Sequence, residues 1–230
     1  MNDRISDIDL LPPCQVLREM FATRTVLMPD GSRKPLTANI SAKGCAALYR
    51  MVLALRPVLV VEIGMAHGVS TLSILAGLMQ TGGRLISIDP YTDWESGKLA
   101  ALHGVCRAGF TGNHRHLQLR SYEALPRLLL EETSVDLGYI DGCHDFDHAF
   151  IDFFFLDRMI PFGGVLGFND AGWPAVFKVI QYLRKHREYE ELDVGLKPDY
   201  SARNAFLGVA RRILNMPRQD RYFCKTGDTK

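Results

Sequence analysis

Short apolar runs alternate with amphipathic stretches through the middle of this chain of 230 residues. The apolar runs lie at 57–63, 84–88, 116–119, 136–140 and 164–168. The stretches with helical spacing lie at 41–55, 69–80, 95–109, 121–132, 145–159 and 174–187. A short run that is apolar throughout indicates a strand buried on both faces. The alternation therefore predicts an α/β fold with a parallel sheet that helices cover on both sides.

The pattern changes after the last helical stretch. The segments YEELDVGL (189–196) and NAFLGVARRI (204–213) read as two strands, and their connection is too short for a parallel crossover. We therefore expect a Rossmann-like, seven-stranded, mostly parallel sheet with an antiparallel closing strand. The expected divisions are a helix and loop cover over 1–40, a single α/β domain over 41–213, and a polar surface tail over 214–230.

The composition is that of an ordinary globular chain. The formal charge is +1, with 47% hydrophobic and 23% charged residues, so neither a nucleic acid nor an acidic membrane surface is an expected partner. No apolar run approaches the ~18 residues that span a bilayer, and the N-terminus lacks a secretory signal. The scattered cysteines form no CxxC pair, which favours a reduced, cytoplasmic setting. A homo-oligomer is compatible with this sequence.

The first apolar run leads into a glycine-containing turn, VEIGMAHGVSTLSILAGL (61–78). Ligands of open α/β sheets bind at the carboxyl ends of strands, so this turn is the first candidate site. Gly64 permits a tight bend, and Gly68 lets the backbone approach a ligand. Glu62 stands just before the turn and Ser70 just after it. Free N–H groups at the start of the following helix favour an anionic group.

A second clue is Asp89, which ends the strand expected at 84–88. A carboxylate at this place suits the two hydroxyls of a ribose. A dinucleotide site would show the pattern G-x-G-x-x-G, and the turn lacks the third glycine. A smaller nucleoside that carries a carboxylate therefore fits better than a dinucleotide.

The pattern E-x-G-x-x-x-G-x-S-T, followed by a strand that ends in I-D, resembles the cofactor-binding half of class I S-adenosylmethionine-dependent methyltransferases. The resemblance extends over roughly residues 41–212, and small-molecule O-methyltransferases of the catechol and macrocin types are the most similar members. It implies that S-adenosylmethionine is the cofactor and that Asp89 holds its ribose. By the same resemblance Gly64, Gly68 and Ser70 surround the methionine moiety, and Ser121 and Tyr122 border the adenine. The remaining residues counted as cofactor-binding are Glu62 and Asp141.

A second group of polar residues follows the strands expected at 136–140 and 164–168. Asp141 ends the first of them, and Asn169 and Asp170 end the second. Adjacent parallel strands lie about 4.8 Å apart, so these side chains can converge at one edge of the sheet. Their oxygens suit Mg²⁺ far better than zinc. The resemblance to catechol-type enzymes implies the same three residues as metal ligands, although Asn169 and Asp170 stand in reversed order.

His144 falls where catechol-type enzymes carry a lysine as the general base. An imidazole can accept a proton near neutral pH, so His144 is the candidate base. The segment DGCH also matches a D-G-x-H segment of the macrocin-like relatives. Two alternatives stay open: Asp141 could cap the following helix, and His144 could be a structural residue of its first turn.

Three further groups of residues have competing interpretations. His148 and Asp152 have metal-like spacing, but a surface contact is the favoured interpretation. Trp94 and Trp173 could line a substrate pocket or could pack in the interior. The aromatic stripe of the helix at 145–159 is expected to be core packing rather than a cofactor site. This stripe consists of Phe146, Phe150, Phe153, Phe154 and Met159.

These observations predict a methyltransferase that transfers a methyl group from S-adenosylmethionine to a hydroxyl of a small molecule, with help from Mg²⁺. A sugar, a polyketide-type natural product and a catechol are equally compatible acceptors. Residues 1–40 and the loop at 92–105 are the expected covers of the substrate. The alternatives are a nicotinamide-dependent Rossmann oxidoreductase and a non-catalytic or hydroxylase-like relative.

Overall fold

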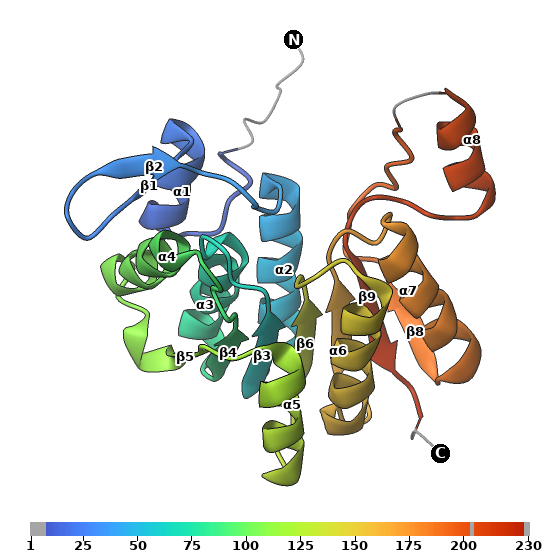
Figure 1. Ribbon diagram of the computed structural model, residues 1–230. Coiled ribbons are helices and arrows are strands. Elements are labelled where there is room, and N and C mark those ends of the chain that lie inside the picture. Colours follow the sequence, from blue (N-terminus) through green and yellow to red (C-terminus); the bar gives the residue numbers. More distant parts are fainter. Residues whose placement is uncertain (1–7, 203–204, 228–230) are drawn as a thin grey trace. The chain divides into compact units, whose positions relative to one another are not determined.

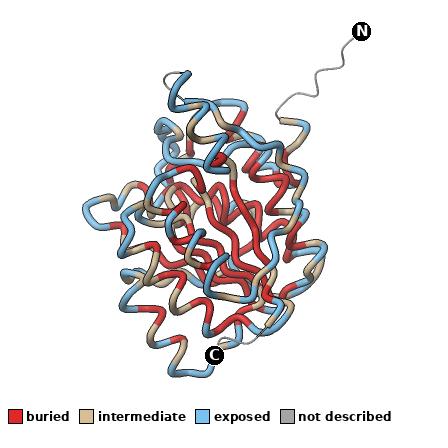
Figure 2. The backbone as a smooth tube through the Cα atoms, turned by 90° about the vertical axis from the view of Figure 1, so that its right-hand side faces the viewer, coloured by how far each residue is buried: buried red, intermediate tan, exposed pale blue. Residues whose placement is uncertain are grey.

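The structure, a computed structural model, describes residues 8–202 and 205–227 (Figure 1). The chain divides into two compact units, of which the first ends at Leu119 and the second begins at Arg120. In both units the runs of buried residues belong mainly to the strands and to the inner sides of the helices (Figure 2). Within the described part of the chain, no helix has both the length and the apolar character needed to cross a bilayer.

Three parallel strands form the sheet of the first unit. They are β3 (Leu59–Ile63), β4 (Arg84–Ile88) and β5 (His114–Leu117), and β4 lies between the other two. All five residues of β3 are buried, as expected for a strand covered on both faces. The crossovers contain α3 (Val69–Thr81) and α4 (Glu95–Arg107). The helix α2 (Ala42–Leu55) packs against α3 and begins at its cap Ser41, whose hydroxyl accepts a hydrogen bond from the Gly44 N–H.

The N-terminal segment of the first unit is a helix followed by a hairpin. The helix α1 (Gln15–Thr23) precedes β1 (Thr25–Leu27) and β2 (Arg33–Pro35), which pair antiparallel. Glu19 forms ion pairs with Arg33 and with Arg107 of α4, the second at 2.6 Å. The described part of the expected cover over residues 1–40 is therefore attached to the α/β core, and residues 1–7 of that cover lie outside the described residues.

The second unit contains four strands in the order β6-β7-β9-β8. The strands β6 (Leu137–Ile140) and β7 (Val165–Phe168) are parallel, whereas β9 (Arg221–Lys225) pairs antiparallel with both β7 and β8 (Tyr189–Leu192). The helices of this unit are α5 (Ser121–Leu130), α6 (Phe146–Met159), α7 (Pro174–His186) and α8 (Ala205–Ile213). The two units together supply the seven strands of the expected, mostly parallel sheet with antiparallel closing strands.

The closing strand is not the segment that the sequence indicated. The described part of 204–213 is the helix α8, with the apolar side chains of Phe206, Val209 and Ile213 exposed. The strand β9 instead comes from the expected surface tail, 214–230. Its residues other than Cys224 are buried. The two basic ones can be buried because distant acidic groups neutralise them: Arg221 pairs with Glu191, and Lys225 lies near Asp157. That pairing cannot be seen in the local sequence.

The aromatic stripe of α6 is only partly buried. Phe153 and Met159 face the interior as expected, but Phe146 is 47% exposed, and Phe150 and Phe154 are half-buried. The buried face of α6 instead includes two carboxylates and one small residue. Its members are Ala149, Asp152, Phe153, Leu156, Asp157 and Met159.

Candidate functional site

The turn between β3 and α3 has a backbone conformation that few residues adopt. Gly64 and Gly68 have φ of 87° and 81°, and Ala66 between them has φ of 46°. Such positive values are unfavourable for side-chain-bearing residues, which explains the two glycines. The helix α3 begins at Val69, and its N-cap residue, Gly68, has no side chain that could cap the helix. Its first N–H groups are therefore available to an anionic ligand.

Asp89, which directly follows β4, holds this turn through hydrogen bonds to its backbone. Its Oδ2 atom accepts hydrogen bonds from the N–H groups of Met65 at 2.9 Å and Ala66 at 3.0 Å. Its Oδ1 atom accepts a hydrogen bond from the Tyr91 N–H at 2.9 Å. A carboxylate has about four lone-pair positions, so Oδ1 retains room for a hydroxyl donor. The ribose contact expected for Asp89 stays a prediction, and the structure shows the carboxylate joining the loop after β3 to the loop after β4.

Glu62 supports the turn from the interior of the first unit. Its side chain is fully buried, and Oε2 accepts hydrogen bonds from the hydroxyls of Thr71 at 2.7 Å and Ser87 at 2.6 Å. Burial raises the pKa of Glu62 to about 6, against the opposing effect of the nearby hydroxyls, Ser70 among them. Ser70 is itself buried. The cofactor contacts expected for Glu62 and Ser70 stay predictions, and the position of both side chains favours an indirect role through the turn.

Replacing Glu62 with glutamine should change how stability depends on pH. The pKa of Glu62 is raised from 4.5 to about 6 on folding, so the folded state binds this proton more tightly and loses stability as pH rises through that window. The glutamine variant lacks this loss. We expect its free energy of unfolding, relative to the wild type, to rise by about 2 kcal/mol between pH 4 and pH 7. Urea denaturation at the two pH values measures it, and a constant difference would contradict the prediction.

Two aromatic residues and a histidine complete the surroundings of the turn, and sequence reasoning did not select His67 or Tyr91. The Tyr91 hydroxyl donates to the Ala66 carbonyl at 2.6 Å. The Nδ1 atom of His67 lies 2.9 Å from the Thr37 carbonyl, and its ring meets that of Trp94 edge to face at 4.8 Å. The segment around Thr37 is thereby tied to the turn, and the cover expected from the N-terminal segment stays a prediction.

In the second unit, Asn169 is held by a buried acid that sequence reasoning missed. The Asn169 amide donates to Asp220 Oδ1 at 2.9 Å, and the hydroxyl of Tyr139 donates to Asp220 Oδ2 at 2.8 Å. Burial, followed by the charge of Asp170, raises the pKa of Asp220 to about 6. Because the Asn169 nitrogen is directed at Asp220, its amide oxygen is turned away and remains an available ligand atom.

The structure brings His144 and Asp170 together. The His144 Nε2 atom lies 3.3 Å from Asp170 Oδ2, and its ring stacks on Trp173 with centroids 5.0 Å apart. Asp170 has a positive φ of 49°, so the backbone bends sharply in the loop after β7. Asp141 directly follows β6, and its charge is among those that help burial to raise the pKa of the Tyr139 hydroxyl. The oxygens of Asp141, Asn169 and Asp170 suit Mg²⁺, and the metal site that they would form stays a prediction.

Ser121 and Tyr122, expected to border the adenine, are the first two residues of α5. Tyr122 is 42% exposed, and its ring lies 6.3 Å from that of His148. The pair formed by His148 and Asp152 is not the surface contact that was favoured, because Asp152 is only 1% exposed. Burial raises the pKa of Asp152 to about 6, while the Ser121 hydroxyl and His148 lower it.

The predicted site residues thus form two groups, one in each unit. The first consists of Glu62, Gly64, Gly68, Ser70 and Asp89, and the second of Ser121, Tyr122, Asp141, His144, Asn169 and Asp170. Within each group the structure places residues at the ends of strands or at the start of a helix, as expected from the fold. The expectation that Asp89 and Asp141 serve one acceptor stays a prediction.

Comparisons of sequence and structure relate this chain to methyltransferases. The model of a family described as a methyltransferase domain, Methyltransf_24, matches residues 61–171. A curated relative, the O-methyltransferase hkm8 of Aspergillus hancockii, is 26% identical over 168 residues. That match covers 73% of this chain, and it spans 60% of the length of the relative.

Solved structures share the fold. The O-methyltransferase TomG of Streptomyces achromogenes, in complex with SAM, has a TM-score of 0.64 at 16% identity, with coverage of 99% of this chain and 92% of TomG. An O-methyltransferase of Bacillus cereus, in complex with SAH, has the same TM-score at 14% identity, with coverage of 99% and 93%. The family match and the shared fold confirm the resemblance to class I S-adenosylmethionine-dependent methyltransferases.

Proposed function

We propose that this chain, whose residues 61–171 match a methyltransferase domain, transfers a methyl group from S-adenosylmethionine to a hydroxyl of a small molecule. The observation that carries the proposal is the turn from Gly64 to Gly68, which the carboxylate of Asp89 holds by two backbone hydrogen bonds. TomG, which shares the fold, is an O-methyltransferase involved in tomaymycin synthesis. A hydroxylated natural product, with a sugar, polyketide or catechol core, is the acceptor that we propose.

The first unit offers complementary groups for each part of the cofactor. The uncapped N-terminus of α3 would receive the carboxylate of the methionine moiety, because its N–H groups and the helix dipole both favour an anion. The Oδ1 atom of Asp89 would accept from the ribose hydroxyls. Gly64 and Gly68 leave the backbone of the turn without side chains at these points. Ser121 and Tyr122 are the proposed neighbours of the adenine.

The second unit would prepare the acceptor. In the reaction the hydroxyl oxygen forms a bond to the methyl carbon, the carbon–sulfur bond breaks, and the hydroxyl proton must leave. We propose that His144 accepts this proton as the general base. Asp170, 3.3 Å away, would then stabilise the charged imidazole. Stacking on Trp173 fixes the ring. Asp141, Asp170 and the amide oxygen of Asn169 would hold Mg²⁺, which when bound lowers the cost of removing a proton from the acceptor hydroxyl.

Replacing His144 with alanine should lower turnover about thirtyfold and leave the affinity for S-adenosylmethionine within twofold of the wild type. The expected loss is below that of an enclosed base because the His144 side chain is 30% exposed and water can replace it in part. Steady-state kinetics and calorimetry measure the two quantities. His186→Ala, which removes an exposed imidazole at the end of α7, is the control. Wild-type turnover in His144→Ala would assign this residue to structure alone.

Calorimetry with S-adenosylmethionine and NAD side by side tests the proposal, followed by turnover with a panel of hydroxylated acceptors. Binding of S-adenosylmethionine together with methylation of an acceptor would support it. Binding of NAD alone would indicate an oxidoreductase, and binding of S-adenosylmethionine without any turnover would indicate a non-catalytic relative. No disulfide bond joins the cysteines of residues 8–202 and 205–227, and we propose a reducing, cytoplasmic setting for this activity.

A further inference from the structure

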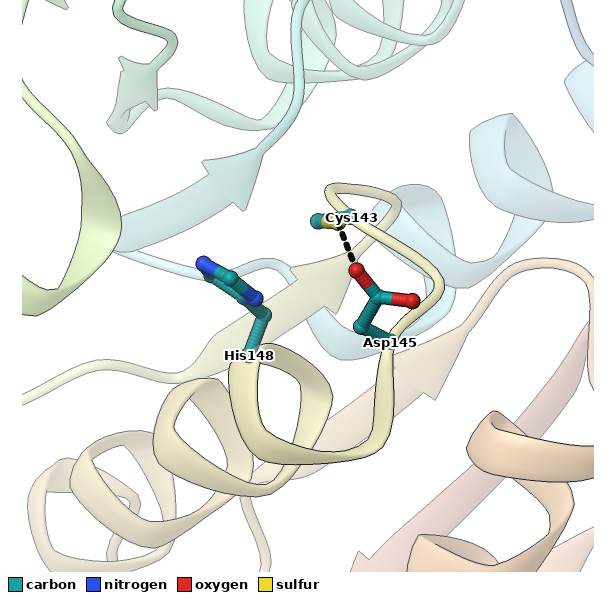
Figure 3. A group of neighbouring side chains, drawn as sticks. All are labelled: Cys143, Asp145 and His148. Atoms are coloured by element: carbon teal, nitrogen blue, oxygen red, sulfur yellow. Dashed lines mark hydrogen bonds between the residues drawn. The ribbon is translucent and has the colours of Figure 1, made fainter.

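We propose that Cys143, Asp145 and His148 form a second cation site, which takes a divalent ion of the zinc class. Cys143 and Asp145 lie on the loop between β6 and α6, and His148 lies on the first turn of α6 (Figure 3). The thiol sulfur, a carboxylate oxygen and a ring nitrogen of these residues all lie within 4.8 Å of one another. They are the one such trio of His, Cys, Asp or Glu side chains found among residues 8–202 and 205–227.

The distances between these atoms are near those of a tetrahedral site. With metal–ligand bonds of about 2.0–2.3 Å and tetrahedral angles, neighbouring ligand atoms are about 3.5 Å apart. The Sγ atom of Cys143 is already 3.4 Å from Asp145 Oδ2. The imidazole of His148 must approach by no more than about 1.3 Å. The side chain is 35% exposed and its Nδ1 atom lies 3.5 Å from Asp147 Oδ1, so binding of the ion requires a rotation of the ring.

The donor atoms decide which cation this site takes. A thiolate and an imidazole are soft or borderline ligands that suit Zn²⁺ and Co²⁺, whereas Mg²⁺ and Ca²⁺ require oxygen ligands. The site therefore differs in chemistry from the oxygen set of Asp141, Asn169 and Asp170. Cys143 and Asp145 are exposed, so water can fill the fourth position of a tetrahedral ion.

A buried carboxylate provides independent support for this assignment. Asp152 follows His148 by one helical turn and is only 1% exposed, and its Oδ1 atom has no hydrogen-bond partner among the described residues. A buried polar atom without a partner is costly. A histidine that ligates a metal usually donates its other ring N–H to such a carboxylate, which fixes the ring and strengthens the ligand. Asp152 stands one turn after His148 on α6, where it would accept this N–H once the ring has turned toward the ion.

The experiment titrates the metal-free full-length chain with Co²⁺, which reports a cysteine ligand through a thiolate-to-cobalt absorption band. We expect one equivalent of Co²⁺ to produce the band and Zn²⁺ to displace it. Cys143→Ser should abolish the band, and His148→Ala should weaken binding at least tenfold. Asp152→Asn should weaken binding about tenfold, as is usual for loss of a carboxylate behind a ligating histidine.

Two control variants establish that the band arises from Cys143 and its neighbours. Cys106→Ser removes another exposed thiol, and Asp170→Asn removes an oxygen ligand of the proposed magnesium site; both variants should keep the band. A band that survives Cys143→Ser, a band lost in Cys106→Ser, or the absence of any band would overturn the proposal. The readout is independent of methyl transfer, so its failure would leave the proposed activity untouched.

Alkylation of thiols in the unaltered chain gives a second measurement. Zn²⁺ should protect Cys143 from iodoacetamide and should leave Cys106 reactive, as mass spectrometry of the two peptides can show. Equal alkylation of Cys143 with and without Zn²⁺ would contradict the site even if a variant failed to fold.

Discussion

Asparagine in place of Asp89 is expected to weaken the binding of S-adenosylmethionine about a thousandfold, which is about 4 kcal/mol. The carboxylate receives the Met65 and Ala66 N–H groups on one oxygen and the Tyr91 N–H on the other. Hydrogen bonds to a charged group contribute about 1.5–3 kcal/mol each. An amide offers a single acceptor oxygen, so it cannot hold the turn and accept from a ribose at the same time.

Calorimetric titration with S-adenosylmethionine measures the effect of Asp89→Asn, and thermal unfolding shows whether the variant is folded. The matched control is Asp93→Asn, which alters an exposed acid in the same loop. This control should bind like the wild type. Wild-type affinity in a folded Asp89→Asn variant would remove the assignment of the ribose to this carboxylate.

Asparagine in place of Asp157 should destabilise the protein by about 3–5 kcal/mol, the usual effect of breaking a buried ion pair. Asp157 is fully buried in α6. It receives the guanidinium of Arg187 at 2.8 Å and the hydroxyl of Tyr189 at 3.0 Å, and the ammonium of Lys225 lies 3.7 Å away. The amide would leave the buried cation of Lys225 without a neutralising charge.

Chemical denaturation followed by circular dichroism measures this loss. Asp147→Asn is the control because it changes a 77% exposed carboxylate on the same helix, and it should alter the free energy of unfolding by less than about 0.5 kcal/mol. A loss below about 1 kcal/mol for Asp157→Asn would show that the interactions of Asp157 with Arg187 and Lys225 contribute little to holding β9 against α6.

Much of the fold could be predicted because its signals are local. Runs such as 84–88 and 164–168 are apolar throughout, and the helices between strands show regular spacing. The strand β9 was missed because Arg221 and Lys225 give it a polar sequence, although Glu191 and Asp157 neutralise these cations in the fold. The helix α8 was wrongly predicted to be a strand. None of its residues is buried, so its apolar residues do not mark a buried helix face that the sequence would reveal.

The candidate site, like the fold, could be predicted only where its sequence signals are local. The positions of Gly64, Gly68 and Asp89 follow from a turn and a strand end, and both features can be recognised in the sequence. The residues that hold the site come from distant segments. Asp220 reaches Asn169 across 51 positions and Thr37 meets His67 across 30, and no local pattern indicates such contacts.

A crystal structure of this chain with S-adenosylhomocysteine would show whether the turn at 64–68 and Asp89 hold the nucleoside. We predict that the ribose hydroxyls will lie within hydrogen-bond distance of the Asp89 carboxylate and that the ligand's carboxylate will lie at the N-terminus of α3. Density for the nucleoside at any place away from the turn at 64–68, with Asp89 in contact only with the backbone, would rule out this cofactor site.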